Sequence, residues 1–384
     1  MPGHELIGKE EKKAVEEVFD TGGVLYRYGL DDRRQHIFRV DELEKEIAKK
    51  VGAKYCHCVC NGTAALKIAL FSLGVKPGDE VITQSFTFIA TVEAILELGA
   101  IPVVTEVDKT LNMDPEDLEK KITKKTKVII PVHMAGVASK MAEIIEVAKK
   151  NNLSVLEDSC QALGGYYRGK YLGTIGNVGA YSLDIGKIIT TGEGGILVTD
   201  NEDIYFKARE YADHGHEQNP NVPRGEDTRR YWGFNYKMTE LQGAVGLAQL
   251  KKIEYILQKQ RENKKQIKEG IKDIKNIEFR ELPDEGGDAG DTLIFFLEDR
   301  EKASQFAKLL KGKGLGTKNL PDAINWHFAG TWNHIFSNCH LWPKSEALLR
   351  RAIALPIMVD MSQEQINKII QAVYEISEKV SKEI

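Results

Sequence analysis

Hydrophobic positions between residues 40 and 200 follow two alternating patterns, helical spacing and short continuous runs. In the segment 41–51, Leu43, Ile47 and Val51 recur at every fourth position, which predicts the buried face of a helix. The continuous runs between such segments are short enough to be strands. The predicted helices cover 41–51, 62–73, 90–98, 114–121 and 140–150, and the predicted strands cover 56–60, 80–83, 101–107, 127–132 and 154–157.

This alternation predicts an α/β fold. Strands that are unbroken apolar runs are usually buried on both faces, so we expect a mostly parallel central sheet flanked by helices. Two further strands are predicted at 180–183 and 195–199, with a Gly-rich turn between them. After them the pattern predicts a helix, a polar loop over 214–231, and a long helix from Met238 into the 260s.

The C-terminal third has a different pattern. A strand is predicted at 292–297, and helices are predicted at 302–310 and 363–379. Such an arrangement is typical of a smaller α+β domain. We therefore expect a large domain over 1–250, in which residues 1–40 contribute to the substrate site, and a small C-terminal domain over 251–384.

Composition narrows the class of protein. The 384 residues are 42% hydrophobic and 29% charged, which excludes a disordered chain, a collagen-like chain and a small disulfide scaffold. The formal net charge of −4 argues against a nucleic-acid binder. No apolar run reaches the roughly 18 residues of a membrane span, and the N-terminus lacks a signal-peptide core. We expect a cytoplasmic protein with no membrane partner.

Three of the five cysteines alternate along one predicted strand, at Cys56, Cys58 and Cys60. Alternate positions point to one side of a strand, and a metal site would need wider spacing and a second pair of ligands. We therefore expect buried free thiols rather than metal ligands. Cys160 and Cys339 have no evident partner.

Four segments carry the candidate chemistry, because ligands bind at the carboxyl ends of the strands in such sheets. The first, 61–66, enters a helix whose free N–H groups suit a phosphate, with Gly62 for close approach and Thr63 as a hydroxyl. Any strand-to-helix turn with a glycine has the same pattern. The second, 156–161, ends a strand with Asp158, which fits a metal ligand, a ribose contact, the partner of a ring nitrogen, or a helix N-cap.

The third segment, 181–195, places Lys187 between two strands, five residues after Ser182 and just before the Gly-rich turn. Most lysines in a chain lie on the surface, and position alone distinguishes this one. In the fourth segment, 233–242, Asn235 is a candidate ligand. The same segment has a simpler structural interpretation, because Thr239 and Gln242 have the spacing of a helix capping box.

Together the four segments fit pyridoxal phosphate. Its chemistry requires a lysine that forms a Schiff base, an acidic partner for the pyridine nitrogen and a phosphate site. Asp158 would keep the ring nitrogen protonated. Lys187 would hold the aldehyde and then move a proton between the amino carbon and the cofactor carbon.

With these residues in place, the chain resembles the DegT-type sugar aminotransferases, which are fold-type I pyridoxal-phosphate enzymes. The resemblance extends over nearly the whole chain, and its motifs follow the order of the family. The motifs that carry it are Asn61-Gly-Thr-Ala-Ala-Leu66, Ser85-Phe-Thr-Phe-Ile-Ala-Thr91, Pro131-Val-His-Met-Ala-Gly136, Glu157-Asp-Ser-Cys-Gln161, Ser182 with Lys187, Gly192-Glu-Gly-Gly195 and Gly233-Phe-Asn-Tyr-Lys-Met238.

The resemblance implies a role for each matching residue. Lys187 matches the Schiff-base lysine, Asp158 the partner of the ring nitrogen, and Gln161 the residue near the ring hydroxyl. Phe88 matches the aromatic side chain that stacks on the ring. The residues that match the phosphate site are Gly62, Thr63, Ala64 and Ser182, and Asn235 matches a residue that reaches the phosphate of the neighbouring subunit's cofactor. A homodimer with shared active sites is therefore implied.

A narrower resemblance concerns the substrate. Several short segments resemble a subgroup that includes 8-amino-3,8-dideoxy-octulosonate aminotransferases, whose sugar acid substrate carries a carboxylate. These segments are Met1-Pro-Gly-His-Glu-Leu6, Tyr26-Arg-Tyr28, Asp213-His-Gly-His216, Arg224-Gly225 and Asn325-Trp-His327. Guanidinium groups bind carboxylates in a bidentate way, so the arginines are candidate clamps. The predicted substrate residues are Tyr26, Arg27, His216, Arg224 and His327.

The resemblance also separates amination from dehydration, because some family members are dehydratases with His in place of Lys187. We therefore predict transfer of an amino group from an amino acid, glutamate, to a keto- or aldehydo-sugar, with an 8-oxo-octulosonate sugar acid as one acceptor. We expect this reaction to belong to amino-sugar and lipopolysaccharide biosynthesis. Three alternatives stay open: a nucleotide-linked keto-sugar aminotransferase, a related sugar dehydratase, and a non-catalytic regulatory protein on the same fold.

Overall fold

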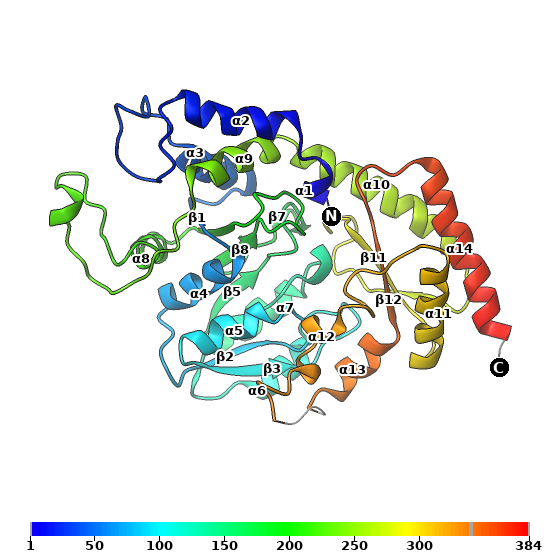
Figure 1. Cartoon of the computed structure of the whole chain (residues 1–384). Coiled ribbons are helices and arrows are strands. Elements are labelled where there is room, and N and C mark those ends of the chain that lie inside the picture. Colours follow the sequence, from blue (N-terminus) through cyan, green and yellow to red (C-terminus); the bar gives the residue numbers. More distant parts are fainter. Residues whose placement is uncertain (1, 338–340, 383–384) are drawn as a thin grey trace.

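The computed structural model describes residues 2–337 and 341–382, and a seven-stranded sheet forms its centre (Figure 1). The strand order is β1-β9-β8-β5-β4-β2-β3. The strands are β1 (Tyr55–Val59), β2 (Glu80–Gln84), β3 (Ile101–Thr105), β4 (Thr126–Ile130), β5 (Ser154–Asp158), β8 (Val178–Ser182) and β9 (Gly195–Thr199). Strand β9 runs antiparallel to both its neighbours, and the other pairs are parallel. The predicted mostly parallel sheet is confirmed.

Helices cover both faces of this sheet, as the continuous apolar strands predict. One hydrophobic core joins alternate strand residues such as Val128 and Ile130 to α4 (Gly62–Ser72), α5 (Ala90–Glu97) and α8 (Glu202–Tyr211). On the opposite face, Ile129 packs with α6 (Pro115–Lys121) and α7 (Met141–Lys150). Strands β1, β8 and β9 pack there against α3 (Arg39–Val51).

The predicted long helix from Met238 is wrong, because the structure has two helices, α9 (Glu240–Leu250) and α10 (Ile253–Ile271). At the break, the amine of Lys252 donates to the Leu6 carbonyl at 2.7 Å and pairs with Glu11 at 2.7 Å. The start is as predicted, since Thr239 and Gln242 form a capping box. Two N-terminal helices were not predicted, α1 (Pro2–Glu5) and α2 (Lys9–Asp20).

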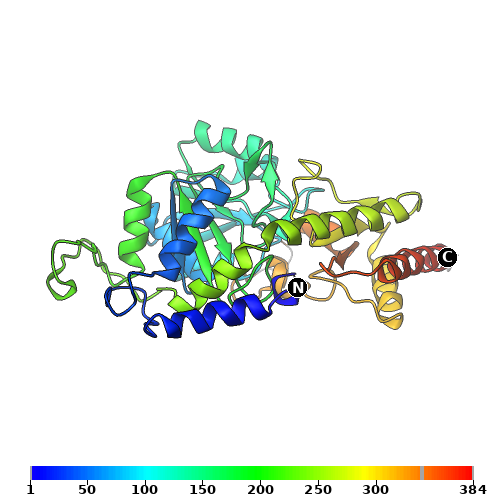
Figure 2. The ribbon, with the colours of Figure 1, turned by 90° about the horizontal axis from the view of Figure 1, so that it is seen from above.

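The C-terminal part has a three-stranded antiparallel sheet, in the order β10-β11-β12, and a hydrophobic core of its own. Its elements are β10 (Glu278–Phe279), β11 (Thr292–Phe296), α11 (Arg300–Gly312), α12 (Ile324–His327), α13 (Pro343–Arg350), β12 (Ala352–Pro356) and α14 (Gln363–Lys382). Figure 2 shows α10 running from the large sheet towards this part. Phe328 and Trp332, however, belong to the core of the large sheet. The domain boundary near residue 250 stays a prediction.

Residues 214–231, here called the arm, project from the body beside the loop 21–38 (Figure 1). The arm contains a short 3-10 helix, η2 (Arg224–Glu226). A hairpin of β6 (Tyr166–Tyr167) and β7 (Lys170–Tyr171) and two further 3-10 helices, η1 (Met134–Gly136) and η3 (Ala329–Thr331), complete the elements. Within the described ranges, no helix has both the length and the apolar character that crossing a membrane requires.

The predicted buried thiols are confirmed for Cys56 and Cys58, which lie in the core against α3. Cys60 is half-buried just after β1, and Cys160 is half-buried after β5. Cys339 lies outside the described residues.

Candidate active site

The carboxyl ends of β1, β5 and β8 meet around Gly62. A Cβ atom added to Gly62 would lie 2.8 Å from Cβ of Ser182 and 3.4 Å from Sγ of Cys160. Only glycine fits between these segments, which explains the residue type without reference to a ligand. The structure thus brings together three of the predicted segments. We call Gly62, Thr63 and Ser182 the cup.

The first turn of α4 presents free backbone donors at the cup. Asn61 caps the helix, since its Oδ1 accepts from the Ala64 N–H at 2.8 Å. The amides of Gly62 and Thr63 donate no hydrogen bond within the described part of the chain. Together with the positive end of the helix dipole, they can bind an anion. The Ala64 amide is already used by the cap, so the predicted contribution of Ala64 does not include a free N–H.

Asp158 and its neighbour Glu157 have different partners. Asp158 is 4% exposed, and its carboxylate accepts from the Thr91 hydroxyl at 2.7 Å and from the Cys160 N–H at 3.1 Å. Glu157 is fully buried and accepts from the Gly173 N–H at 2.9 Å and from two further backbone amides. Its Oε2 also lies 3.0 Å from Nε2 of His133. Glu157 therefore fixes the end of β5, and Asp158 is the carboxylate available to a ligand.

Lys187 lies half-buried in the loop between β8 and β9. Its backbone is held by two hydrogen bonds, from its N–H to the Asp184 carbonyl and from the Gly3 N–H to its own carbonyl, both at 3.0 Å. Its amine forms no hydrogen bond or ion pair with the described residues. The positive charge of Lys187 helps to lower the pKa of His327, after the larger effect of burial. The unpaired amine of Lys187 is thus close to His327 and to Cys160. Burial raises the pKa of the Cys160 thiol.

Phe88, Trp326 and His327 form an aromatic wall, and His327 is the member whose pKa the charge of Lys187 helps to lower. The Phe88 ring is 42% exposed and lies 5.5 Å from the His327 ring and 6.5 Å from the Trp326 ring, measured between centroids. Two backbone bonds join the segments, from Thr87 N–H to the His327 carbonyl at 2.9 Å and from Ile89 N–H to the Trp326 carbonyl at 3.1 Å. Sequence reasoning did not assign Trp326 to the site, although this residue directly precedes His327, which was predicted.

The ring nitrogens of His327 have separate functions. Nδ1 lies 2.8 Å from the Ala323 carbonyl, so this nitrogen carries the proton. Burial lowers the pKa of His327, which favours the neutral ring. Nε2 is then an acceptor, as a contact to a sugar hydroxyl requires.

Gln161 is held in one orientation. Its Oε1 accepts from the Ala135 N–H at 3.0 Å, and a backbone N–H can only face an oxygen. The amide nitrogen of Gln161 has no hydrogen-bond partner among the described residues, so it is free to donate to a ligand.

Arg27, a predicted substrate clamp, is already paired inside the chain, so its role as a clamp stays a prediction. Arg27 is 3% exposed and donates to the Cys58 carbonyl at 2.7 Å and to Glu44 at 2.5 Å. Burial opposes the charge of Glu44, but Arg27, His57 and the Cys58 N–H together outweigh it and lower the pKa of Glu44 to about 2. The sequence does not show this pairing, because Glu44 lies on α3 and Arg27 in the preceding loop.

Arg224 is likewise paired inside the chain. Its guanidinium binds Asp213 in a bidentate way, at 2.6 and 2.7 Å, and Lys237 donates to the same carboxylate at 2.5 Å. Asp213 is fully buried, which would raise its pKa, but the hydrogen bonds from Arg224 and Lys237 lower the pKa to about 2. The role of Arg224 as a substrate clamp therefore also stays a prediction, with its guanidinium already engaged by Asp213.

The predicted substrate residues lie in three places. His327 is in the aromatic wall, whereas Tyr26, Arg27 and Arg224 line an open cavity of about 770 Å³ between the arm and α3. His216 is buried at the base of the arm, with Nδ1 3.4 Å from the carboxylate of Asp227.

Asn235 is exposed just after the arm, and its Oδ1 lies 3.4 Å from the Lys237 N–H. The segment is held to the body by a β-bridge between Asn235 and Asp213. None of the cup residues lines the cavity between the arm and α3.

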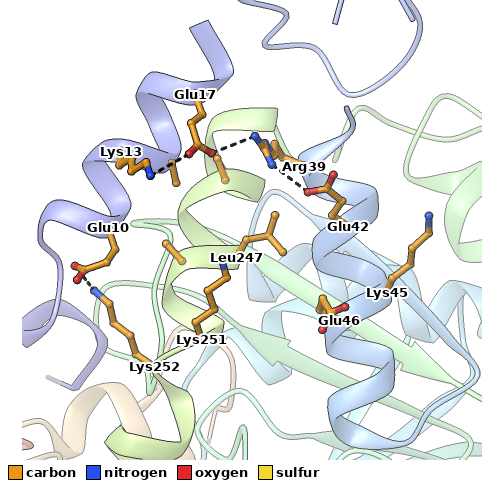
Figure 3. A pocket seen from close by; sticks show the side chains of 13 residues that line it. Glu10, Lys13, Glu17, Arg39, Glu42, Lys45, Glu46, Leu247, Lys251 and Lys252 are labelled. Carbon is orange, nitrogen blue, oxygen red and sulfur yellow. Dashed lines mark hydrogen bonds and ion pairs between the residues drawn. The ribbon is translucent and has the colours of Figure 1, made fainter. Parts of the chain in front are cut away.

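A further groove, of about 710 Å³, lies between α2, α3 and α9 (Figure 3). Its charged side chains pair with one another: Arg39 bonds Glu17 at 3.3 Å and Glu42 at 3.2 Å, and Lys252 bonds Glu10 at 3.3 Å. These are surface ion pairs between basic and acidic side chains. No predicted site residue lines the groove. It offers no catalytic arrangement.

The residues at the cup fit a phosphorylated pyridine aldehyde. Free amides and a hydroxyl can hold the phosphate, Asp158 can pair with a ring nitrogen, and Phe88 offers one ring face. The unpaired amine of Lys187 can react with the aldehyde. The described residues include no group of three metal-binding side chains.

Comparisons with known proteins agree with this site. The model of the DegT/DnrJ/EryC1/StrS aminotransferase family matches residues 6–374. GDP-perosamine synthase of Caulobacter vibrioides is 43% identical over 218 residues, which are 56% of each chain. The spore coat polysaccharide biosynthesis protein SpsC of Bacillus subtilis is 31% identical over 383 residues, 97% of this chain and 95% of that one.

A solved structure gives the same fold with the cofactor. The putative sugar aminotransferase Spr1654 from Streptococcus pneumoniae, in its PLP form, has a TM-score of 0.83 and 25% identity, and the match covers 97% of both chains.

Proposed function

The chain belongs to the DegT/DnrJ/EryC1/StrS aminotransferase family, whose cofactor is pyridoxal phosphate, and from this premise we propose that it aminates a nucleotide-linked keto-sugar with glutamate as donor. The observation that carries the proposal is the unpaired amine of Lys187, whose positive charge opposes the burial that raises the pKa of Cys160, a residue in contact with Asp158 and next to the cup. The same lysine favours amination over dehydration, because a histidine there could not hold an aldehyde and regain it.

Each residue of the site then has a task. When bound, pyridoxal phosphate supplies an aldehyde and an electron-withdrawing ring. The cup would hold the phosphate, and Asp158 would keep a proton on the ring nitrogen. Lys187 would move a proton at the carbon that gains or loses the amine. The wall of Phe88 and Trp326 would exclude water from one side.

The acceptor is inferred from two observations. GDP-perosamine synthase, the relative named above, has a nucleotide in its name. In addition, Arg27 and Arg224 are both bound to carboxylates of this chain, so neither offers a free guanidinium to a sugar acid. The 8-oxo-octulosonate acceptor therefore stays a prediction that lacks the two clamps on which it depended.

We also propose that a second copy of the chain completes each site. Next to the arm, Trp232 is 67% exposed and Phe234 is 41% exposed, and such aromatic residues are enriched in protein interfaces. Asn235 follows directly. In a homodimer these residues would lie against the neighbouring subunit, with Asn235 near its cofactor. The cytoplasmic location and the part in lipopolysaccharide biosynthesis stay predictions.

An acceptor panel tests the reaction. The holoenzyme is incubated with ¹⁵N-glutamate and either a GDP-linked keto-sugar or an 8-oxo-octulosonate, and the products are analysed by mass spectrometry. We expect ¹⁵N in the nucleotide-linked product only. Loss of a hydroxyl without glutamate would show a dehydratase, and no change of the cofactor spectrum on adding glutamate would show a protein without this catalysis.

Trp326→Ala tests the wall within the same assay. We expect the KM of the acceptor to rise about tenfold, as for the loss of one aromatic contact, while the KM of glutamate changes little. Tyr255→Ala serves as the control, because this tyrosine on α10 is 48% exposed and lies outside the wall and outside the proposed interface. An unchanged acceptor KM in the Trp326 variant would remove the wall from the substrate site.

A further inference from the structure

The turn that faces Gln161 has a backbone conformation that its sequence does not favour. Ala135, in η1, has φ 52° and ψ 38°, the left-handed region that alanine rarely adopts, and it is 3% exposed. Residues in such conformations persist only where the surroundings hold them, and they often lie at functional sites. The surroundings of Ala135 therefore show what fixes this turn.

Arg280 holds the turn from the C-terminal part. Its guanidinium is buried and donates to the Met134 carbonyl at 2.9 Å, to the Thr110 carbonyl at 2.6 Å and to Oδ1 of Asn112 at 3.3 Å. Asn112 closes the network, because its Oδ1 also accepts from the Met134 N–H at 3.1 Å.

No carboxylate lies within hydrogen-bond distance of this guanidinium among the described residues. Burial lowers the pKa of Arg280 to about 9, still above neutral, so its charge is retained at pH 7. A buried arginine that binds only carbonyl and amide oxygens lowers the stability of the fold. Its planar guanidinium, however, sets the positions of several backbone segments at once.

A second contact from the same side fixes the end of the turn. The Ala289 N–H donates to the Gly136 carbonyl at 3.0 Å. Gly136 has φ 72°, and an added Cβ atom would lie 2.6 Å from Cβ of Ala289. The turn is thus held between the C-terminal part on one side and Gln161 on the other.

We propose that Arg280 is a positioning residue for the cofactor. By holding the Met134 carbonyl, Arg280 keeps the Ala135 N–H bonded to Oε1 of Gln161. The side-chain N–H of Gln161 is then left to donate to the ring hydroxyl oxygen. The proposal rests on the proposed function, since it needs pyridoxal phosphate in the cup. It links the C-terminal part of the chain to the electronic state of the ring.

The test uses the pH at which the visible absorbance of the bound cofactor changes. A hydrogen bond donated to the ring oxygen stabilises the negative charge on that oxygen, and it thereby lowers the pH of this midpoint. Gln161→Met and Arg280→Met should therefore each raise the midpoint, by about 0.5 to 1 pH unit for the loss of one hydrogen bond. In the double variant the shift should be no larger than in Gln161→Met, because both changes remove the same bond.

Trp342 provides the matched control. It also joins the C-terminal part to the large sheet, since its indole N–H donates to the Val104 carbonyl at 2.8 Å, and it does not contact the turn. Trp342→Phe should leave the midpoint unchanged even if it lowers the melting temperature. Arg280→Lys serves where Arg280→Met does not fold. Lysine keeps a charge but cannot bridge all three oxygens, so a smaller upward shift is expected.

The outcomes separate the two proposals. A melting temperature lowered without any shift of the midpoint would show that Arg280 is only structural, and additive shifts in the double variant would show that it does not act through Gln161. A wild-type protein without a cofactor band would overturn the proposed function and this inference together. A normal band with an unshifted Arg280 variant would overturn the inference alone.

Discussion

Polar groups are used differently at the cup and at the arm. At the cup, the amine of Lys187 and the amides of Gly62 and Thr63 have no partner in the described part of the chain. At the arm and the loop beside it, the charged groups are paired: Arg27 with Glu44, and Arg224 with Asp213. Directly after the arm, two aromatic side chains are exposed, Trp232 and Phe234.

This difference indicates which chemistry one chain can perform alone. Unpaired donors next to a buried carboxylate form a binding site, because a ligand replaces water without breaking an existing bond. A paired arginine can bind a substrate carboxylate only by giving up its own partner. We therefore place the cofactor at the cup of each chain, and we interpret the region of the arm as structural and as a contact for a second copy.

Arg27→Met is expected to have the largest effect, and it tests the structural interpretation of that region. The change leaves Glu44 as a buried charge without its partner, which typically costs about 3–5 kcal/mol in the free energy of unfolding. Denaturant unfolding measures this, with the exposed Arg33→Met on the same loop as a control that should change little. A stable Arg27 variant with a raised acceptor KM would restore Arg27 as a substrate clamp.

Asp158→Asn tests the cup. Without the charge, the ring nitrogen loses its anionic partner, and turnover should fall by about a hundred- to a thousandfold, as for other preorganised electrostatic groups. The cofactor should stay bound, because the amide has the same shape. Steady-state kinetics and the cofactor content are the measurements, and the exposed Asp203→Asn is the control. Wild-type turnover in the Asp158 variant would contradict the assignment.

Asp213→Asn tests the pairing at the arm through its pH dependence. The pKa of Asp213 is about 2 in the folded chain and ordinarily 3.8, so its stabilisation is complete above pH 3.8 and is lost as the pH falls towards 2. The shift corresponds to about 2 kcal/mol. Melting temperatures between pH 6 and pH 2 should show wild type above the variant at pH 6, with the difference disappearing at pH 2. A constant difference would mean that the pair does not hold the arm.

Gly62→Ala should have the smallest effect. The new Cβ atom would meet Cβ of Ser182 at 2.8 Å and displace its hydroxyl from the cup. We expect pyridoxal phosphate to bind about tenfold more weakly, which corresponds to about 1.4 kcal/mol. Gly312→Ala is the control, since no atom lies within 4 Å of the added Cβ there. Equal affinity of both variants would show that the cup tolerates a side chain.

The sequence predicts most of the large sheet, because its strands and helices follow local patterns, and it places candidate cofactor residues at strand ends, whose roles stay predictions. Strand and helix periods identify the elements, and residues such as Gly62 and Asp158 sit at strand ends that chain order alone brings to one edge. The break between α9 and α10 lies where Lys252 contacts the N-terminal segment, and the spacing of apolar residues along the chain does not show such a contact. The pairing of Arg27 with Glu44 was missed for the same reason, since charge along the chain does not show which carboxylate an arginine meets.

The most direct test of the cofactor site is to find which residue carries the cofactor. The holoenzyme is reduced with borohydride, digested, and mapped by mass spectrometry, with Lys187→Ala treated in parallel. We predict that the cofactor is covalently fixed to Lys187 alone and that the variant carries none. A reduced cofactor on another lysine, or on the Lys187 variant, would contradict the central claim.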